Sequence, residues 1–221
     1  EVTLLFQDLL IGVTHFFRDR QAFAALEKKV IPKLFKNCID DKIRIWVPGC
    51  ATGEEPYSIA ILLREYMQRH DVPVPKIQIF ATDIDEKALE VARAGVYPEG
   101  TTRDVSARRL KHFFAPRGNG YQITKDIREM CVFSAHDLIR DAPFSRLDLI
   151  SCRNVLIYMN AELQSRVLTL FHFALRTGRF LFLGPSENVT QQSKFFGVVD
   201  AKHRLFRATA AVGAHLPALP M

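Results

Sequence analysis

RIWVPGCATGEEPYSIA, residues 44–60, combines a strand, a glycine turn and the start of a helix. The β-branched and aromatic run from Ile43 to Val47 predicts a buried strand, which Pro48 and Gly49 bring to an end. Residues 54–69 have the apolar spacing of a helix. A strand, a glycine turn and a helix in succession are typical of α/β proteins that bind a ligand at the strand end.

The turn at residues 49–53 contains Gly49 and Gly53, which would let a ligand approach the backbone closely. A helix N-terminus normally attracts an anion, but this one begins with Glu54 and Glu55. The two carboxylates disfavour a pyrophosphate and suit a cation such as a sulfonium or an ammonium. An ordinary turn, with acidic residues placed to favour the helix dipole, is the alternative interpretation.

Strand-like and helix-like segments alternate on both sides of this stretch. Helices are expected over residues 21–36, 54–69, 85–94 and 161–175. Strands are expected over residues 43–47, 77–81, 130–133, 147–151 and 180–183, with a terminal hairpin formed by 195–199 and 203–207. Repeated strand–helix units predict an α/β fold with a doubly wound, mostly parallel sheet that is covered on both faces.

Residues 97–129 interrupt the alternation with charged residues, a Gly118-Asn119-Gly120 turn and a short strand at 121–124. We interpret this region as a small antiparallel β insertion within one domain spanning residues 21–207. Residues 1–20 are assigned to an N-terminal linker segment. Residues 208–221, rich in Ala and Pro, are expected to form a flexible tail.

Composition narrows the classes of function. The net charge is +6, but the positive residues are scattered, which argues against nucleic acid as the partner. No apolar run is long enough for a membrane span, and no signal peptide opens the chain. The four cysteines lack CxxC spacing and the seven histidines lack HxxxH or HExxH spacing, so no metal is expected and a reducing cytoplasm fits.

Polar residues follow the expected strands, where α/β sheets bind ligands. Asp83 ends the second strand and is placed to accept hydrogen bonds from two ribose hydroxyls, whereas Asp85 suits the N-cap of the next helix. Asp137 and the backbone after it, at Leu138, follow the third strand and are suited to an adenine ring. A plain surface loop is the alternative for that third position.

The fourth strand ends in Cys152-Arg153-Asn154. Arg153 and Asn154 would be costly there unless they are paired or face a cleft. If the first and fourth strands are neighbours, Cys50 and Cys152 would line the same site. Neither cysteine has a histidine near it in sequence, so a small neutral lining role is expected rather than a nucleophile.

Five stretches together resemble the chemoreceptor glutamate methyltransferase (CheR) family, including its fusions with a methylesterase. They are GVTHFFRD (12–19), RIWVPGCATGEEPYSIA (44–60), ATDID (81–85), CRNVLIY (152–158) and LGPSE (183–187), and the likeness extends in order over about residues 10–207. The resemblance implies a class I methyltransferase (Rossmann-like) fold. It also implies S-adenosyl-L-methionine as cofactor, S-adenosyl-L-homocysteine as product, and glutamates on the cytoplasmic domains of chemoreceptors as substrate, in the bacterial cytoplasm.

The resemblance also implies roles for individual residues. Thr14 and Arg18 would lie in the segment that covers the methyl donor, and Arg18 and Tyr158 would flank the incoming glutamate. A core aromatic with a satisfied hydroxyl is the alternative for Tyr158. The remaining expected donor contacts are Gly49 by backbone approach, Glu54 on the amino acid moiety, Asp83 on ribose, Asp137 and Leu138 on adenine, and Arg153 and Asn154 beside the donor.

The sequence departs from the family pattern at three places. Gly12 stands where the family often has Asn, and Gly178-Arg179 stands where Gly-Gly is usual, a change expected to affect only a turn. Family members usually carry an N-terminal helical domain that helps dock the receptor, whereas only about ten residues precede the Thr14 motif here, so either the chain is a fragment of a larger protein or docking works differently. The insertion at 97–129 is a candidate docking surface for the receptor, and a plain hairpin is the equal alternative.

Two other functions share this fold. A nucleic-acid methyltransferase would tolerate the positive charge, but its usual Asp/Asn-Pro-Pro-aromatic motif is replaced here by Cys-Arg-Asn-Val at 152–155. A non-catalytic module that binds the donor is the third interpretation. For the glutamate reaction itself no general base is expected, because a carboxylate with an ordinary pKa of about 4.3 is ionised at neutral pH.

Overall fold

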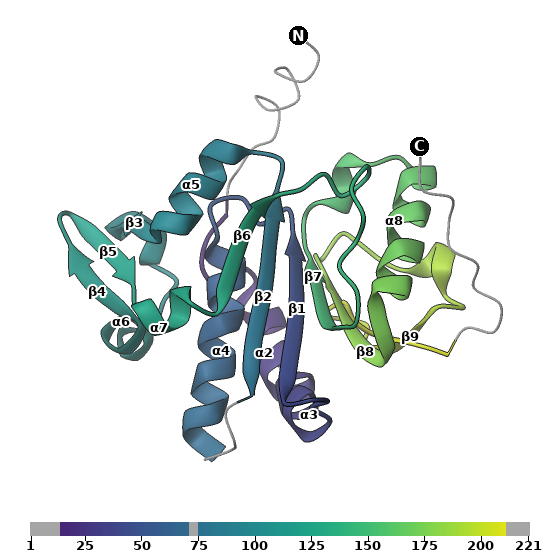
Figure 1. Ribbon diagram of the computed structural model, residues 1–221, viewed down its shortest axis with the longest axis horizontal. Coiled ribbons are helices and arrows are strands. Elements are labelled where there is room, and N and C mark those ends of the chain that lie inside the picture. The colour runs from purple at the N-terminus through teal and green to yellow at the C-terminus, as the bar shows by residue number, and fades with distance from the viewer. Residues whose placement is uncertain (1–13, 71–74, 211–221) are drawn as a thin grey trace, which may run out of the picture.

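The computed structural model describes residues 14–70 and 75–210. A seven-stranded sheet with the strand order β6-β2-β1-β7-β8-β10-β9 forms its centre (Figure 1). The strands are β1 (Lys42–Pro48), β2 (Lys76–Asp83), β6 (Cys131–Ala135), β7 (Leu147–Cys152), β8 (Leu175–Leu183), β9 (Phe196–Asp200) and β10 (Leu205–Ala208). The first five in spatial order are parallel, while β10 is antiparallel to β8 and β9. The expected doubly wound, mostly parallel sheet is therefore confirmed, as is the adjacency of the first and fourth strands.

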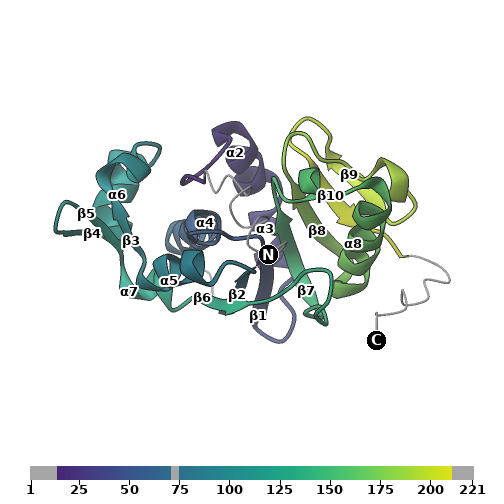
Figure 2. The same cartoon turned by 90° about the horizontal axis from the view of Figure 1, so that it is seen from above.

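Strand β1 separates two hydrophobic cores because alternate side chains point to opposite faces of a sheet. Ile43, Ile45 and Val47 belong to the core beneath α2 and α4, whereas Trp46 packs on the other face against Phe171 of α8. Figures 1 and 2 show α2, α3 and α4 on one side of the central strands and α8 on the opposite side. Both faces are thus buried, which explains the almost continuous apolar run in the sequence of β1.

The helices are α2 (Arg20–Lys29), α3 (Ile31–Lys36), α4 (Glu54–His70), α5 (Glu86–Ala94), α6 (Ala107–Phe113), α7 (Lys125–Arg128) and α8 (Ala161–Ala174). The expectation of one helix over 21–36 was wrong, because the helix is interrupted at Val30, which separates α2 from α3. Pro32 stands at the start of α3, and proline has no N–H to continue the hydrogen-bond ladder of a helix.

Both ends of α5 are set by the residues expected from the sequence. The Asp85 carboxylate accepts hydrogen bonds from the N–H groups of Lys87 and Ala88, as an N-cap does. Gly95 ends the helix in the left-handed conformation, with φ of 60°. The cap assigned to Asp85 is confirmed, which leaves the Asp83 side chain facing the edge of the sheet.

The insertion is confirmed as antiparallel, but it has three strands rather than two. They are β3 (Val96–Pro98), β4 (Phe114–Arg117) and β5 (Gly120–Ile123), in the order β3-β5-β4. The β4–β5 pair turns at Gly118 and Asn119, as expected. Figure 1 shows the insertion projecting to one side of the main sheet, next to α5.

Arg179 does more than complete a turn, so that expectation was wrong. Its side chain is buried, its Nε lies 3.1 Å from the Asp148 carboxylate, and its Nη2 donates a hydrogen bond to the carbonyl of Asn37. Asp148 in turn accepts a hydrogen bond from the N–H of Arg44 at 2.9 Å. A buried ion pair thus joins β7, β8 and the start of β1 at the end of the sheet opposite the strand-end turns.

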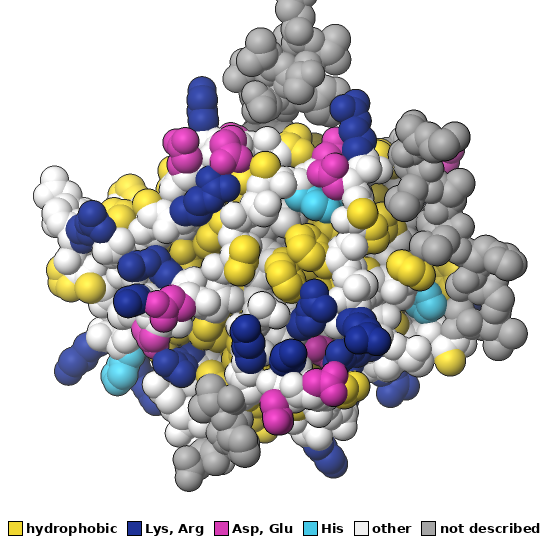
Figure 3. All heavy atoms as spheres, in the orientation of Figure 1, with side chains coloured by type: hydrophobic (Ala, Val, Ile, Leu, Met, Phe, Trp, Pro, Cys, Tyr) yellow, Lys and Arg dark blue, Asp and Glu magenta, His cyan; other side chains and the backbone are white. Residues whose placement is uncertain are grey.

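The remaining boundaries differ little from expectation, except that β8 begins at Leu175 rather than at 180. Residues 1–13 of the expected linker segment 1–20, and residues 211–221 of the expected tail 208–221, lie outside the described residues. Within the described ranges, no helix has the length and apolar character needed to cross a membrane. Figure 3 shows Lys and Arg side chains spread over one face with Asp and Glu among them.

Candidate functional site

The carboxyl ends of β1 and β2 are joined through Asp83. One Asp83 oxygen accepts the N–H of Ala51, in the glycine turn, at 2.8 Å, and the other accepts the N–H of Asp85 at 3.0 Å. Each carboxylate oxygen retains a further lone pair for a ligand. Asp83 therefore fixes the turn after β1 and is only partly buried at the sheet edge, where a ribose is expected.

The two glycines of the turn are required by protein packing. Gly49 has φ of +67°, and a Cβ there would lie 2.4 Å from a methyl carbon of Val155. Gly53 has φ of +94°, and a Cβ there would lie 2.9 Å from the Cβ of Ala92. The groups that approach these two glycines closely are therefore side chains of the protein, Val155 and Ala92. Contact between the backbone of Gly49 and a ligand stays a prediction.

Glu54 is a buried carboxylate at the beginning of α4, with 3% of the residue exposed. Its two oxygens lie 2.9 and 2.7 Å from the Thr52 hydroxyl, which donates to them. Burial raises the pKa of Glu54, and the Thr52 hydrogen bond opposes this effect. A buried carboxylate with a raised pKa favours a cationic partner, so an ammonium group at this position would hold Glu54 in its ionised form.

Glu55, the next residue, points into the protein and forms a chain of ion pairs. Its carboxylate accepts the Ser151 hydroxyl at 2.6 Å and lies 3.3 Å from Nη1 of Arg153. Nη2 of Arg153 lies 2.5 Å from the Asp19 carboxylate. Burial raises the pKa of Glu55, while the positive charge of Arg153 lowers it. Arg153 thus links α4 to the segment that precedes α2.

The Arg153 side chain is fully buried between two aromatic rings. Its guanidinium carbon lies 5.3 Å from the centre of the Phe23 ring and 4.7 Å from that of Phe182. A guanidinium in such a position is stabilised by the ring faces as well as by its carboxylates. The sequence required Arg153 to be paired or to face a cleft, and the structure pairs it with Glu55 and Asp19.

A second carboxylate, Glu187, organises the loop after β7. It accepts four backbone N–H groups, from Asn154 at 3.1 Å, Val155 at 2.9 Å, Leu156 at 2.8 Å and Gly184 at 2.6 Å. Asn154 has φ of +61°, a conformation that a non-glycine residue adopts at some cost. Glu187 compensates for that cost by satisfying the three successive N–H groups of this loop.

The segment from Phe16 to Asp19 is anchored as expected. Phe16 and Phe17 are buried, and the N–H of Phe17 donates to the Ser58 hydroxyl at 2.9 Å. Phe17 and Asp19 both have positive φ, 53° and 61°, so the backbone is bent on each side of Arg18. Arg18 itself is half-buried between two residues that are held in place.

Other expected site residues are placed as follows. Tyr158 lies in the short 3-10 helix after β7 and is 51% exposed, so it is not a core aromatic. Asp137 accepts the N–H groups of Ile139 and Arg140 and so closes a turn, while Leu138 packs against the core on the α8 side. Thr14 is half-buried. Contact of these residues with a ligand stays a prediction.

The cysteines next to the site are thiols, not thiolates. Burial raises the pKa of Cys50 and of Cys152 well above the ordinary value, and neither is in a disulfide. A thiol is a poor nucleophile compared with a thiolate. Both cysteines therefore suit the small neutral role expected from the sequence.

Glu55 was grouped with Glu54 as a carboxylate that suits a cationic ligand, but it pairs with Arg153 instead. Two contributors to the site were missed by sequence reasoning: Asp19 and Glu187. Each lay inside a quoted motif, but nothing local distinguishes an acid that accepts distant N–H groups from a solvated one. The one sequence feature that could have indicated the role of Glu187 is the glycine turn just before it, in residues 183–187.

S-adenosylmethionine fits the residues at this edge. Glu54 offers a buried carboxylate of the kind that an ammonium would need, and Asp83 retains acceptor capacity for a ribose. Among the described residues, Oδ1 of Asn154 is buried without a hydrogen-bond partner. A buried orphan acceptor is unfavourable unless a ligand donor satisfies it, so Asn154 supports a bound amino group here.

Removing the Asp83 carboxylate should weaken donor binding. We expect Asp83→Ala to lower the affinity for S-adenosylhomocysteine by about 1.5–3 kcal/mol in calorimetry, the usual worth of hydrogen bonds to a charged group. Asp83→Asn retains one acceptor for the Ala51 N–H and separates loss of the turn from loss of the ribose contact. Asp126→Ala, at an exposed ion pair with Arg64, is the matched control. An unchanged affinity in both Asp83 variants would remove Asp83 from the site.

Comparison with known proteins agrees with this geometry. The family model for the CheR methyltransferase, SAM binding domain, matches residues 12–205. An "Uncharacterized 104.1 kDa protein in hypE 3'region" of Rhodobacter capsulatus is 43% identical, with 94% of this chain and 22% of that protein covered. The "Putative methyltransferase Cher3" of Pseudomonas putida is 37% identical, with 92% and 75% covered.

A third relative is the chemotaxis protein methyltransferase of Borreliella burgdorferi, 34% identical, with 86% of this chain and 69% of that protein covered. The chain therefore spans about a fifth of the Rhodobacter protein and about 70% or more of the other two. The family match covers the sheet up to the first residue of β10, together with the strand-end carboxylates and the Arg18 segment. The chain belongs to the CheR methyltransferase family as its S-adenosylmethionine-binding domain, and S-adenosylmethionine is the cofactor of this methyltransferase.

Proposed function

We propose that this domain transfers the methyl group of S-adenosylmethionine to glutamate side chains on the cytoplasmic domains of chemoreceptors, within the bacterial cytoplasm. The observation that carries the proposal is the anchored segment from Phe16 to Asp19, which holds Arg18 between two fixed residues and is ion-paired to the end of β7. An arginine so placed suits an acidic acceptor, and the names of the chemotaxis relatives support the same substrate.

The cofactor supplies a methyl group activated on a sulfonium. With the cofactor bound, a glutamate oxygen would bond to the methyl carbon as the methyl–sulfur bond breaks, and the electron pair of that bond would stay on sulfur. The substrate enters as a carboxylate, so the chain need not supply a base. Its residues have to align oxygen, methyl and sulfur and keep water out, because water stabilises the separated charges more than the transition state.

Arg18 and Tyr158 are the residues proposed to meet the substrate. A guanidinium can bind a carboxylate through two parallel hydrogen bonds, which orients the oxygen that reacts. Tyr158 is exposed at the end of β7, where its hydroxyl can donate one further hydrogen bond. Arg18 therefore positions the carboxylate rather than activating it.

The chemical nature of the product tests the proposal. Incubation with methyl-labelled donor and receptor cytoplasmic domains should give a labelled protein that releases methanol in mild alkali, because the expected linkage is an ester. Label that withstands alkali would indicate methylation of nitrogen or sulfur and would contradict the glutamate assignment. Donor binding without any labelled protein would indicate a non-catalytic module instead.

Replacing Arg18 even with lysine should lower the methylation rate. We expect Arg18→Ala to reduce the methylation rate at least about tenfold, equivalent to 1.4 kcal/mol or more in the barrier. Arg18→Lys should restore only part of the rate, because an ammonium cannot reproduce the planar fork of a guanidinium. Thermal unfolding of both variants should stay close to that of the parent. Near-normal turnover in both would show that Tyr158 or the backbone orients the carboxylate.

A further inference from the structure

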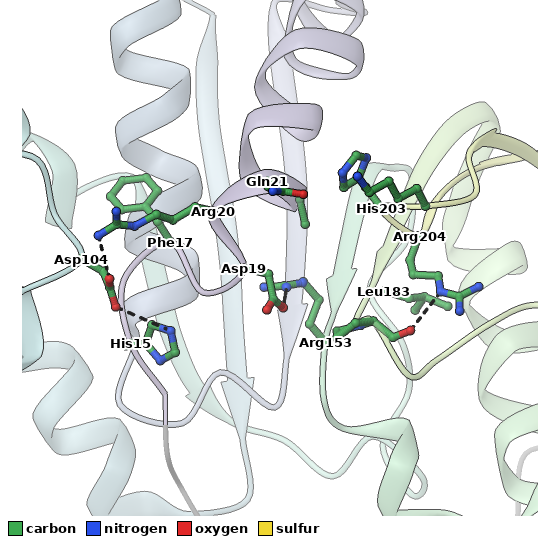
Figure 4. Close-up of a pocket in the computed structure, with 13 residues that line it drawn as sticks. His15, Phe17, Asp19, Arg20, Gln21, Asp104, Arg153, Leu183, His203 and Arg204 are labelled. Atoms are coloured by element: carbon green, nitrogen blue, oxygen red, sulfur yellow. Dashed lines mark hydrogen bonds and ion pairs between the residues drawn. The ribbon is translucent and has the colours of Figure 1, made fainter.

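A cavity of about 470 Å³ opens beside the Arg18 segment. One wall is formed by Phe17, Asp19 and Arg20, and the facing wall by the β9–β10 turn, with Lys202 and Arg204. Figure 4 shows Asp19, Arg20 and Gln21 on one side, His203 and Arg204 on the other, and Arg153 between the two walls. The cavity therefore adjoins the residues that flank Arg18.

Both acidic groups that line this cavity are already ion-paired. The Asp19 carboxylate is paired with Arg153, and the Asp104 carboxylate lies 2.8 Å from Arg20 and 3.7 Å from His15. Among the lining side chains four arginines or lysines stand against two aspartates, which leaves an excess of two positive charges when His is neutral. Within the described residues, neither Lys202 nor Arg204 forms an ion pair with a carboxylate, so that excess is located on the β9–β10 turn.

The turn is held in a fixed position. Asp200 accepts hydrogen bonds from Nζ of Lys29 at 2.5 Å and from the ring of His203 at 2.9 Å, which ties the turn to α2. The Nε of Arg204 donates to the carbonyl of Pro185 at 3.0 Å. The two cations thus stand on a wall whose backbone is anchored at both sides, and their charged ends remain available to a ligand.

We propose that this cationic wall, defined as Lys202 and Arg204, binds acidic side chains that neighbour the acceptor glutamate in the substrate polypeptide. The inference rests on the proposed function for the identity of the acceptor. A cavity of this volume accommodates one or two side chains rather than a whole helix, so a polypeptide substrate would enter it with carboxylates that project from its surface. The wall contributes affinity and specificity, and Arg18 acts on the acceptor carboxylate.

The test is a binding measurement that needs no turnover. A fluorescent 20-residue helical peptide with glutamates spaced over several turns is compared with the same peptide carrying glutamines. We expect the glutamate peptide to bind at least about tenfold more tightly, and Lys202→Glu/Arg204→Glu to abolish that preference, because each reversal replaces attraction by repulsion. Added salt should weaken binding to the parent protein and have little effect on the variant.

The matched control is Lys194→Glu/Arg207→Glu, which makes the same change in net charge at exposed residues of the same region that do not line the cavity. It should bind the glutamate peptide like the parent, and both double variants should bind S-adenosylhomocysteine normally. Equal loss in both double variants would show a general charge effect and overturn the proposal. So would an unchanged preference in Lys202→Glu/Arg204→Glu, or a tighter, wall-dependent interaction with duplex DNA.

The methylation assay of receptor domains separates this inference from the proposed function. If receptor domains become methyl esters and the KM is the same for the parent and for Lys202→Glu/Arg204→Glu, the proposed role of the cationic wall is contradicted and the proposed function is not. Wall-dependent binding of the glutamate peptide without methyl ester formation contradicts the proposed acceptor and leaves an acidic polypeptide as the ligand of the cavity.

Discussion

Glu187→Ala is expected to destabilise the protein strongly. The substitution leaves four backbone N–H groups without their acceptor, and an unsatisfied buried donor costs about 1–3 kcal/mol. Even if water reaches some of them, we expect a loss of about 3 kcal/mol or more in the free energy of unfolding. For a domain of this size that corresponds to a fall in Tm of about 6–12 °C.

Glu187→Gln keeps one carbonyl oxygen as acceptor but turns an NH2 group towards the backbone donors, so its effect should fall between the parent and the alanine variant. Glu90→Ala, at an exposed residue of α5, is the matched control and should change Tm little. Thermal unfolding with and without S-adenosylhomocysteine checks the prediction. A Tm for Glu187→Ala equal to that of Glu90→Ala would mean that the loop after β7 does not depend on this carboxylate.

Arg153→Met is the second change with a large expected effect. It removes the partner of the buried Glu55 carboxylate, and breaking a buried ion pair from one side usually costs about 3–5 kcal/mol. Adding Glu55→Gln removes the lone charge and should recover much of the loss. Arg93→Met, which breaks an exposed pair with Glu86, should alter the free energy of unfolding by less than about 1 kcal/mol.

The Arg153→Met variant should also gain a dependence on pH. Arg153 lowers the pKa of Glu55, which burial raises, so without Arg153 that pKa lies further above its value in the unfolded chain. A carboxyl group whose pKa is raised by folding contributes stability at low pH and loses it as pH rises through the folded pKa. The deficit of the variant relative to the parent should therefore be smaller at pH 5 than at pH 8 in urea unfolding. A deficit independent of pH would show that Glu55 is not left charged and buried.

Sequence reasoning placed Arg153 in the site, but it identified neither Glu187 nor the carboxylates that pair with Arg153. Arg153 was expected either to be paired or to face a cleft, and its partners Asp19 and Glu55 lie 134 and 98 residues away along the chain. The pair forms because β7 lies beside β1, which brings the end of β7 to the start of α4. The adjacency of these strands was anticipated from the general order of such sheets, but the choice among the available carboxylates was not.

The amino-acid sequence by itself determined the alternation of strands and helices, the Asp85 cap, the Gly95 stop, the Gly118-Asn119 turn and the carboxylates that follow β1 and β2. These features depend on residues within about four positions of one another, or on a periodic burial that a strand or a helix imposes. Only the tertiary structure decided the buried Arg179–Asp148 pair, the four N–H groups on Glu187 and the placement of Lys202 and Arg204 opposite Asp19 and Arg20. Each of these requires segments far apart in sequence to meet. Local patterning says that a side chain is charged, but the folded neighbours decide whether it is paired, and with which group.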